Sequence, residues 1–161
     1  MLDLDKVQFK HDNRIDYLTR SDAPIIFYKN LMRAMTTRKR NGGALYIVTI
    51  KILTPSKSYR KGSTAEKRQI AEFEESLIKS SELIKKNLRS QDSFTRMAID
   101  GFYVLISGER SDESKLVERF KRLFADRAKY EVKGNRLTGD LSPKEWLDQV
   151  DQLFFSSSTL K

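Results

Sequence analysis

The chain has 161 residues, with 31 Lys and Arg against 22 Asp and Glu, so its formal net charge at pH 7 is +9. That length is typical of one domain, and 39% hydrophobic with 33% charged residues provides both a core and a charged surface, which excludes disorder for most of the chain. No apolar run approaches the ~20 residues of a membrane span, and residues 1–10 lack the apolar stretch of a signal peptide. The sequence therefore predicts a cytoplasmic protein with no membrane segment.

Cysteine and histidine content narrows the chemistry further. The chain has no cysteine, which excludes disulfides, zinc-thiolate sites, iron-sulfur clusters and thiol nucleophiles. Its single histidine, His11, lies in a polar N-terminal stretch, and this does not favour a catalytic role. A Ser-His-Asp triad or a histidine-rich metal site would require His11 itself.

The first predicted elements are a helix over residues 25–39 and a strand over residues 44–50. In the helix, apolar side chains recur every four residues at Phe27, Leu31 and Met35, and a basic run followed by two glycines marks its end. The strand segment is uninterrupted and rich in apolar and β-branched residues. Such a run is typical of a central strand covered on both faces.

A long helix and a hairpin follow. The helix covers residues 65–88. Its apolar stripe comprises Ile70, Phe73, Leu77, Ile84 and Leu88, and Ser63 or Thr64 can cap its start. Strands are predicted over residues 94–99 and 102–106, joined by Asp100 and Gly101. An Asp-Gly pair between two such runs is the strongest short-range hairpin signal, because a tight primed turn needs positive φ.

The last third of the chain predicts a helix over residues 116–124, a weaker strand over residues 130–133 and a closing helix over residues 146–154. Residues 136–138 are a candidate partner for the weak strand, across the Gly-Asn pair at 134–135. The closing helix begins with Ser-Pro-Lys-Glu, a capping box with proline at the first helical position. The order helix, strand, long helix, hairpin, helix, strand, helix predicts an α/β fold with a mixed central sheet, an antiparallel hairpin and flanking helices. Only residues 1–14 and 156–158 are expected to be loosely held.

Four short strings carry a resemblance to a known family. Residues 16–19 read D-Y-L-T, residues 96–102 read R-M-A-I-D-G-F, residues 117–124 read V-E-R-F-K-R-L-F, and residues 150–155 read V-D-Q-L-F-F. In this order and spacing they resemble the D-x-L-T, the R-Y-G-G-D/E-E-F, the following helix and the closing A-D-x-A-L-Y of GGDEF domains, the diguanylate cyclase family. The resemblance implies the nucleotidyl cyclase-like fold with its ferredoxin-like core. It assigns residues 16–155 to a degenerate GGDEF domain, residues 1–15 to an N-terminal tail or helix, and residues 156–161 to a C-terminal tail.

The resemblance also implies that the cyclase site is degenerate. The family makes cyclic di-GMP from two GTP, using carboxylates that hold two divalent ions and a glutamate that assists attack by the 3′-hydroxyl. The aligned positions here are Thr49, Lys51, Ala98, Ile99, Asp100 and Gly101. One carboxylate beside a lysine cannot hold two divalent ions, and Ile99 puts a branched side chain where bare backbone should approach the phosphates. Residues 53–62 hold no counterpart of the family's phosphate and guanine contacts. We therefore expect no cyclase activity, no metal and no cofactor, and the turn alone explains Asp100.

An inhibitory-site motif of the family is retained. Residues 89–92 read R-S-Q-D, which matches the family's R-x-x-D five residues before the signature, where cyclic di-GMP binds. The resemblance implies ligand contacts from Arg89 and Asp92, with the secondary arginine of the next helix at Arg119 or, one turn along, Arg122. Arg96 is expected to face solvent or to contribute to the same anionic site. The competing interpretation is that an Arg and an Asp three residues apart at a helix end form an ordinary solvated pair.

Three functions are compatible with these features. The first is a catalytically inactive GGDEF domain that acts as a cyclic di-GMP receptor in bacterial second-messenger signalling, where the ligand can bridge two chains into a homodimer. The alternative is a nucleotide-independent module that pairs with another signalling protein. The third is nucleic-acid binding through a basic loop and the basic run 38–40, but helix ends and loops ordinarily collect Lys and Arg, so nucleic acid is not the expected partner. The basic loop comprises Lys57, Arg60, Lys61, Lys67 and Arg68, with Tyr59 among them.

Overall fold

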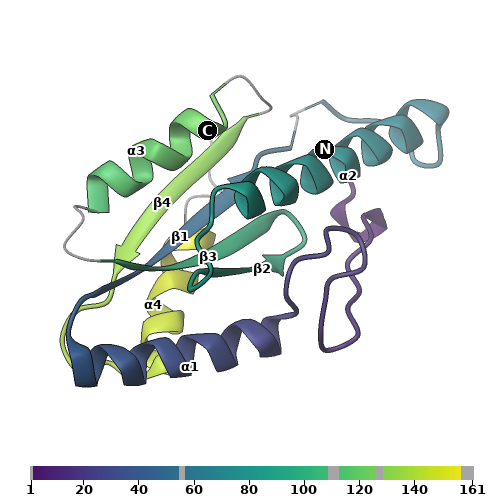
Figure 1. Ribbon diagram of the computed structural model, residues 1–161. Coiled ribbons are helices and arrows are strands. Elements are labelled where there is room, and N and C mark those ends of the chain that lie inside the picture. The colour runs from purple at the N-terminus through teal and green to yellow at the C-terminus, as the bar shows by residue number, and fades with distance from the viewer. Residues whose placement is uncertain (1, 55–56, 109–112, 126–128, 157–161) are drawn as a thin grey trace.

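The computed structural model describes residues 2–54, 57–108, 113–125 and 129–156 as four strands with helices on both sides (Figure 1). The elements in chain order are the short 3-10 helix η1 (Leu4–Lys6), α1 (Pro24–Asn41), β1 (Ala44–Ile52), α2 (Thr64–Lys86), β2 (Ser93–Ala98), β3 (Gly101–Gly108), α3 (Glu113–Leu123), β4 (Tyr130–Arg136) and α4 (Pro143–Ser156). These elements confirm the predicted α/β fold class. None of the helices in these described ranges has the length and apolar character needed to cross a bilayer.

The four strands form one sheet in the order β2-β3-β1-β4. β1 pairs antiparallel with both β3 and β4, and β3 pairs antiparallel with β2. β2 therefore runs parallel to β1, but β3 lies between them. The ladders between the described strands are thus all antiparallel, and the expectation of a mixed sheet is wrong in this respect because the hairpin inserts its second strand beside β1.

β4 is a single strand rather than half of a small hairpin. It pairs along its length with β1, from Tyr130 opposite Ile52 to Arg136 opposite Tyr46. Gly134 lies inside the strand, where a Cβ would be 2.7 Å from Cγ2 of Val117 on α3. The glycine therefore allows α3 to approach the sheet. The predicted pairing of residues 130–133 with 136–138 is wrong because the long-range partner β1 extends the strand through the Gly-Asn pair.

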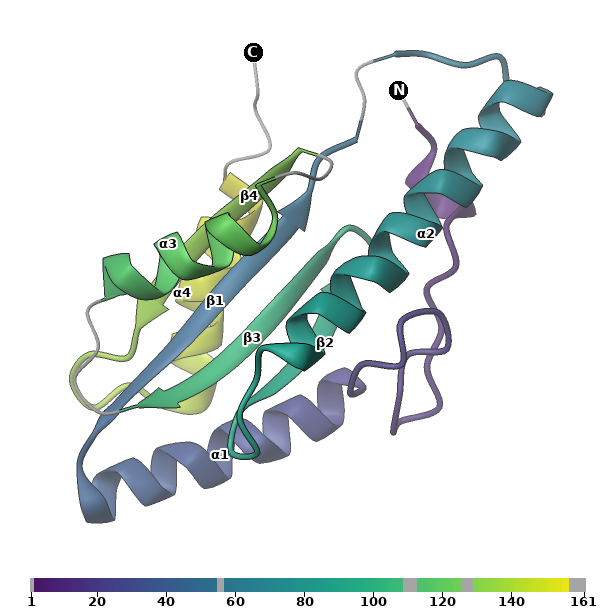
Figure 2. The same ribbon diagram turned by 45° about the horizontal axis from the view of Figure 1, so that its top comes forward.

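The helices cover the two faces of the sheet in pairs (Figure 2). α2 and α3 lie on one face, and α1 and α4 lie on the other. Because successive side chains of a strand point to opposite faces, Tyr46 and Val48 of β1 join the core under α2 and α3, whereas Leu45 and Ile47 join the core under α1 and α4. The same alternation assigns Thr49 to the face covered by α1 and α4.

Two predicted helix starts carry the caps that their sequences suggest. The backbone N–H of Glu66 donates to Oγ of Ser63 at 3.1 Å at the start of α2. At the start of α4, Ser142 and Glu145 exchange hydrogen bonds, with the Glu145 N–H donating to Ser142 Oγ at 3.1 Å and the Ser142 N–H donating to Glu145 Oε1 at 3.2 Å. This reciprocal pair is the capping box expected from the sequence.

The N-terminal segment, residues 2–23, is packed against the domain. Leu2 and Val7 are buried in the core on the α2 side. Asp22 forms a parallel bridge with Thr95 of β2, and Oγ1 of Thr95 donates to the carbonyl oxygen of Asp22 at 2.6 Å. The expectation that residues 1–14 are loosely held is therefore wrong for residues 2–7, because Leu2 and Val7 anchor them in the core, whereas residues 8–14 are exposed. Ser156 ends α4, and residues 157–158 of the predicted tail lie outside the described residues.

Candidate functional site

The R-x-x-D motif forms the turn between α2 and β2. The backbone N–H of Asp92 donates to the Arg89 carbonyl at 3.0 Å, and the backbone N–H of Arg89 donates to Oδ2 of Asp92 at 2.9 Å. Oδ1 of Asp92 accepts from the backbone N–H of Ser107 on β3 at 3.3 Å. The Asp92 carboxylate therefore ties the turn to the sheet. The Arg89 side chain is exposed and has no hydrogen-bond or ion-pair partner among the described residues.

A large open cavity adjoins this turn. Its volume is about 1190 Å³, and it is lined by the second half of α1, the start of β1, the turn itself and the end of β3. Arg33 and Arg38 of α1 line it together with Arg89, and Asp92 adds one carboxylate. The Nε atom of Arg38 is buried without a hydrogen-bond partner in the part of the chain that the structure describes. The cavity thus combines three cationic side chains with one anionic group.

Arg33 and Arg38 were not among the sequence-predicted site residues. Arg38 belongs to the basic run at the end of α1, where cations are favoured by the helix terminus alone, and Arg33 lies about one turn earlier. Nothing local in the sequence brings α1 to the turn after α2. That juxtaposition comes from the sheet, since α1 packs over β2 and β1.

Arg119 and Arg122 lie on α3 and do not line this cavity. They border a separate depression of about 640 Å³ on the surface of α3. Nη2 of Arg119 donates to the carbonyl oxygen of Asn87 at 2.8 Å, at the end of α2 and two residues before Arg89. The Arg119 side chain therefore contacts the chain two residues before the motif, on the face of the sheet that α3 covers.

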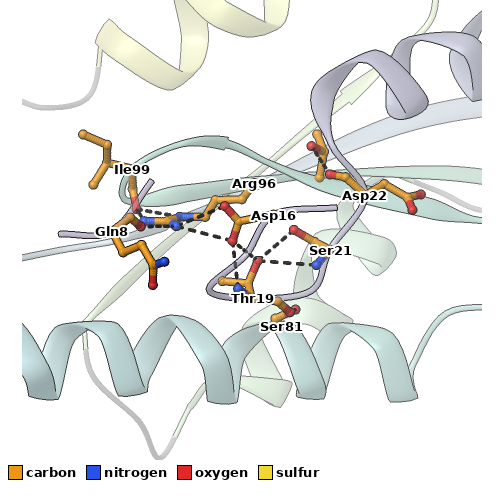
Figure 3. Close-up of polar contacts among 9 residues, drawn as sticks. Gln8, Asp16, Thr19, Ser21, Asp22, Ser81, Arg96 and Ile99 are labelled. Atoms are coloured by element: carbon orange, nitrogen blue, oxygen red, sulfur yellow. Dashed lines mark hydrogen bonds and ion pairs between the residues drawn. The ribbon is translucent and has the colours of Figure 1, made fainter. Parts of the chain in front are cut away.

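Arg96 is buried and fully engaged, contrary to the expectation that it faces solvent or joins the anionic site (Figure 3). Its side chain is 0% exposed. Nη1 donates to the carbonyl oxygen of Gln8 at 2.6 Å and to Oδ1 of Asp16 at 3.3 Å, while Nε and Nη2 donate to the carbonyl oxygen of Ile99 at 3.1 and 2.8 Å. The ring of Phe9 stacks on the guanidinium at 4.8 Å. Arg96 is therefore a structural residue, and each of its three guanidinium nitrogens already donates a hydrogen bond within the protein.

The partner of Arg96 belongs to the D-x-L-T string. Oδ2 of Asp16 accepts from the backbone N–H of Thr19 at 2.8 Å and from its hydroxyl at 2.7 Å. The hydroxyl of Ser81 on α2 donates to the Thr19 carbonyl at 2.7 Å. Burial lowers the pKa of the Arg96 guanidinium, and the Asp16 carboxylate opposes that shift. Two of the four family-like strings therefore meet in one buried network, which joins the N-terminal segment to α2 and to the hairpin.

The positions aligned with the cyclase site gather where β1 meets the hairpin. Lys51 lies opposite Gly101, and Thr49 lies opposite Tyr103 in the β1–β3 ladder. Thr49 and Lys51 are buried, at 5% and 8% exposure. Ile99 and Asp100 form the turn between Ala98, which ends β2, and Gly101, which begins β3. The prediction of a primed turn at Asp100 and Gly101 is therefore wrong in its position, because Gly101 pairs with Ala98 and Lys51 in the sheet and has no positive φ. The positions that the resemblance aligns with the family's cyclase site therefore lie close together in this structure.

The residues at this place do not fit a pair of divalent ions. Asp100 is the one carboxylate among the aligned positions, and burial raises its pKa, partly opposed by the charge of Lys51. The Lys51 ammonium lies 5.0 Å from the centre of the Phe154 ring. Among the described residues no group of three or more His, Asp or Glu side chains is arranged to hold a metal ion. An ammonium and an aromatic ring supply none of the oxygen ligands that such ions require.

The two basic clusters lie at opposite ends of the molecule. Lys57, Arg60 and Lys61 of the predicted basic loop precede α2, and Lys67 and Arg68 lie in its first turns, so the expectation of a single loop is wrong for those two residues. The basic run 38–40 lies at the end of α1 (Figures 1 and 2). Nucleic-acid binding by one continuous basic stripe is therefore not supported by this arrangement.

Comparison with known proteins yields a match in structure and none in sequence. No protein-family model and no curated protein matches the chain. A sensory box/GGDEF family protein from Caulobacter crescentus aligns with a TM-score of 0.70 at 13% identity, covering 89% of this chain and 96% of its own. The GGDEF domain of YfiN (TpbB) from Pseudomonas aeruginosa aligns with a TM-score of 0.68 at 17% identity, covering 88% of this chain and 87% of its own.

A third solved structure carries a ligand. The GGDEF domain of DgcB from Caulobacter crescentus, in complex with c-di-GMP, aligns with a TM-score of 0.68 at 12% identity, covering 92% of this chain and 89% of its own. TM-scores of 0.68 to 0.70 show that the fold is shared, and identities of 12 to 17% show nothing about the chemistry of the site. The chain therefore has the fold of a GGDEF domain.

Proposed function

We propose that the chain is a cyclic di-GMP receptor built on a GGDEF fold that does not synthesise the dinucleotide. The observation that carries this proposal is the cavity beside the R-x-x-D turn, which Arg33, Arg38 and Arg89 line together with Asp92. The complex of the DgcB GGDEF domain with c-di-GMP supports it, because that domain shares this fold.

The chemistry of the cavity suits a ligand with two phosphates and two guanines. A guanidinium offers a planar fork of donors to a phosphate or to the O6 and N7 edge of guanine. A carboxylate has about four acceptor sites, and the backbone N–H groups of Arg89 and Ser107 occupy two at Asp92, so acceptor capacity remains for guanine N1–H and N2–H. At about 1190 Å³ the cavity exceeds the ~300–1000 Å³ of ordinary ligand pockets, which accommodates a dinucleotide.

The residues at the junction of β1 and the hairpin do not favour synthesis of cyclic di-GMP. The Lys51 ammonium lies 5.0 Å from the centre of the Phe154 ring, at a position that the resemblance aligns with the family's ion site. Asp100 is one carboxylate with a raised pKa, which disfavours the charged form that a cation needs. We therefore infer that GTP with Mg²⁺ or Mn²⁺ gives no dinucleotide product.

Isothermal titration of the purified chain with cyclic di-GMP tests the receptor proposal. We expect micromolar or tighter binding, which Arg89→Ala weakens at least about tenfold because one bidentate pair contributes ~1–3 kcal/mol. Arg68→Ala is the matched control, because Arg68 is an exposed arginine of α2 that does not line the cavity. Equal loss in both variants, or no heat at high ligand concentration, would overturn the proposal.

Incubation of the chain with GTP and Mg²⁺ or Mn²⁺ separately tests the inference that it does not synthesise cyclic di-GMP. Chromatography of the products should show GTP alone. Any cyclic di-GMP formed would refute the inference about Lys51 and Asp100 while leaving the binding result intact.

A further inference from the structure

One face of α1 exposes three large apolar side chains. Ile25, Tyr28 and Met32 are 48%, 37% and 47% exposed. They are spaced three and four residues apart, so they form one line along the helix, apart from the face on which Phe27 and Leu31 are buried. Single apolar side chains are ordinary on a protein surface, whereas three in line on one element indicate a docking face. We call Ile25, Tyr28 and Met32 the α1 stripe.

Lys29 lies beside the α1 stripe, Lys39 and Arg40 follow it in the last turn of the same helix, and no carboxylate of the helix accompanies them. α1 has five Lys and Arg residues in its 18 positions and no Asp or Glu. Lys29, Lys39 and Arg40 are exposed, and within the described ranges none of them is in an ion pair. None of these three lines the cavity beside the R-x-x-D turn. The docking face is therefore separate from the proposed dinucleotide site.

We propose that the α1 stripe binds an acidic amphipathic helix of another protein. Helices recognise one another through side chains at i, i+3 or i+4, and i+7, which is the spacing of the stripe. Tyr and Met are enriched at the centres of protein interfaces. A partner helix with an apolar face flanked by Glu or Asp would bury the stripe and pair its carboxylates with the cations of α1.

A second copy of the chain fits this face less well. Two-fold pairing of α1 with itself would set the cations of one helix against those of the other, and like charges across an interface disfavour association. A membrane surface also fits less well, because the other apolar side chains of the helix, Phe27, Leu31 and Met35, are buried in the core. The three remaining side chains give a narrow apolar face for insertion.

Peptide binding to the full chain tests the proposal. The probe is a fluorescent three-heptad helical peptide with Leu on one face and Glu on both flanks, and its counterpart carries Lys at the flanks. We expect the acidic peptide to bind and the basic peptide to bind at least about tenfold more weakly. Tyr28→Ser and Met32→Ser should each weaken the acidic peptide about tenfold. Lys29→Glu should reduce the preference for the acidic peptide.

Phe155→Ser is the matched control, because Phe155 is a 57% exposed aromatic side chain on α4 and the stripe is on α1. It should leave peptide binding unchanged. Equal binding of both peptides, no binding of the acidic peptide, or insensitivity to Tyr28→Ser and Met32→Ser would overturn the proposal.

A dimer in sedimentation that Tyr28→Ser dissociates would assign the stripe to a second copy. Flotation with anionic phosphatidylglycerol vesicles that the same variant abolishes would assign it to a membrane. Cyclic di-GMP titration of these variants should match the wild type, so this proposal and the receptor proposal fail independently.

Discussion

The ring of Phe154 occupies the space that a side chain at Gly101 would need. A Cβ built on Gly101 would lie 2.6 Å from Cε2 of Phe154. The ring is buried on the last turns of α4 and packs edge-on against Tyr103, with centroids 5.5 Å apart. The position aligned with the family's signature glutamate is therefore closed by the core of this chain.

Restoring that glutamate should harm the protein without reviving a cyclase. Gly101→Glu forces a long side chain into the Phe154 ring, and overpacking of this kind costs ~1–3 kcal/mol, or more where a charge is buried. We expect a lower urea midpoint and no product from GTP. The measurement is equilibrium unfolding, followed by the GTP assay on the folded fraction.

A pair of smaller changes isolates the steric cause. Gly101→Ala should already destabilise the chain, and Phe154→Leu combined with Gly101→Ala should recover part of the loss, giving a favourable coupling in a double-mutant cycle. Additive effects of the two substitutions would contradict the close approach of ring and glycine.

The Asp16–Arg96 pair should be one of the most sensitive points of the fold. Arg96→Met leaves a carboxylate that is 2% exposed without its cation and removes the donors to the carbonyl oxygens of Gln8 and Ile99. Breaking a buried pair by removing one partner costs ~3–5 kcal/mol. Urea unfolding monitored by circular dichroism measures the loss.

An exposed ion pair provides the comparison for that result. Lys79 lies 3.0 Å from Glu75 on the surface of α2, with both side chains more than half exposed. Lys79→Met should change stability by ~0.5 kcal/mol or less. Similar losses for Lys79→Met and Arg96→Met would show that the buried pair is not special.

Ligand affinity should depend on the arginines of α1 more than on those of α3. Arg33 and Arg38 line the cavity with Arg89, whereas Arg122 borders the separate depression on α3. We expect Arg33→Ala and Arg38→Ala each to weaken cyclic di-GMP by about tenfold, at ~1–3 kcal/mol per lost bidentate contact, and Arg122→Ala to weaken it less. The reverse ranking in calorimetric titrations would move the binding site to α3.

Asp100 should make stability fall as the pH rises. Burial raises its pKa above the ordinary value of 3.8, so in the window above 3.8 the folded chain binds more protons than the unfolded chain. The free energy of unfolding therefore decreases with rising pH until the folded-state pKa is passed. Asp100→Asn keeps the turn and removes the buried charge, so the variant should be the more stable protein at pH 7 and equal to the wild type near pH 3. Asp140→Asn, at an exposed position, should not show this convergence.

Local pattern predicted most of the fold and about half of the candidate site. Apolar spacing predicted α1, α2, α3 and α4, because each of these signals lies within one element. The Asp-Gly pair predicted the hairpin, although its turn consists of Ile99 and Asp100 and Gly101 belongs to β3. The strand at 130–133 was predicted, but its extension to Arg136 was not, because Gly134 is typical of a turn until β1 is placed beside it. The role of Arg96 escaped for the same reason, since its partner Asp16 lies 80 residues earlier in the chain.

The cavity illustrates the same limit at the site. Arg89 and Asp92 were predicted because they lie within one short motif. Arg33 and Arg38 reach the same place only after α1 has packed across the sheet, and no spacing along the sequence encodes that approach. Chemistry confined to a string of neighbouring residues can be predicted, whereas chemistry assembled by packing cannot.

The bridge between Asp22 and Thr95 has a consequence for association of the sheet. An open strand edge invites a stray strand from another molecule to hydrogen-bond onto it. At the β2 edge, the segment of this chain that precedes α1 lies in that position, where Asp22 forms a bridge with Thr95 and the Thr95 hydroxyl donates to the Asp22 carbonyl oxygen. On the far side, β4 carries the charged pair Lys133 and Glu131, 3.1 Å apart, which resists stacking of an uncharged strand. The segment before α1 therefore covers part of the β2 edge, and the charged pair makes the β4 edge less suited to pairing with an apolar strand.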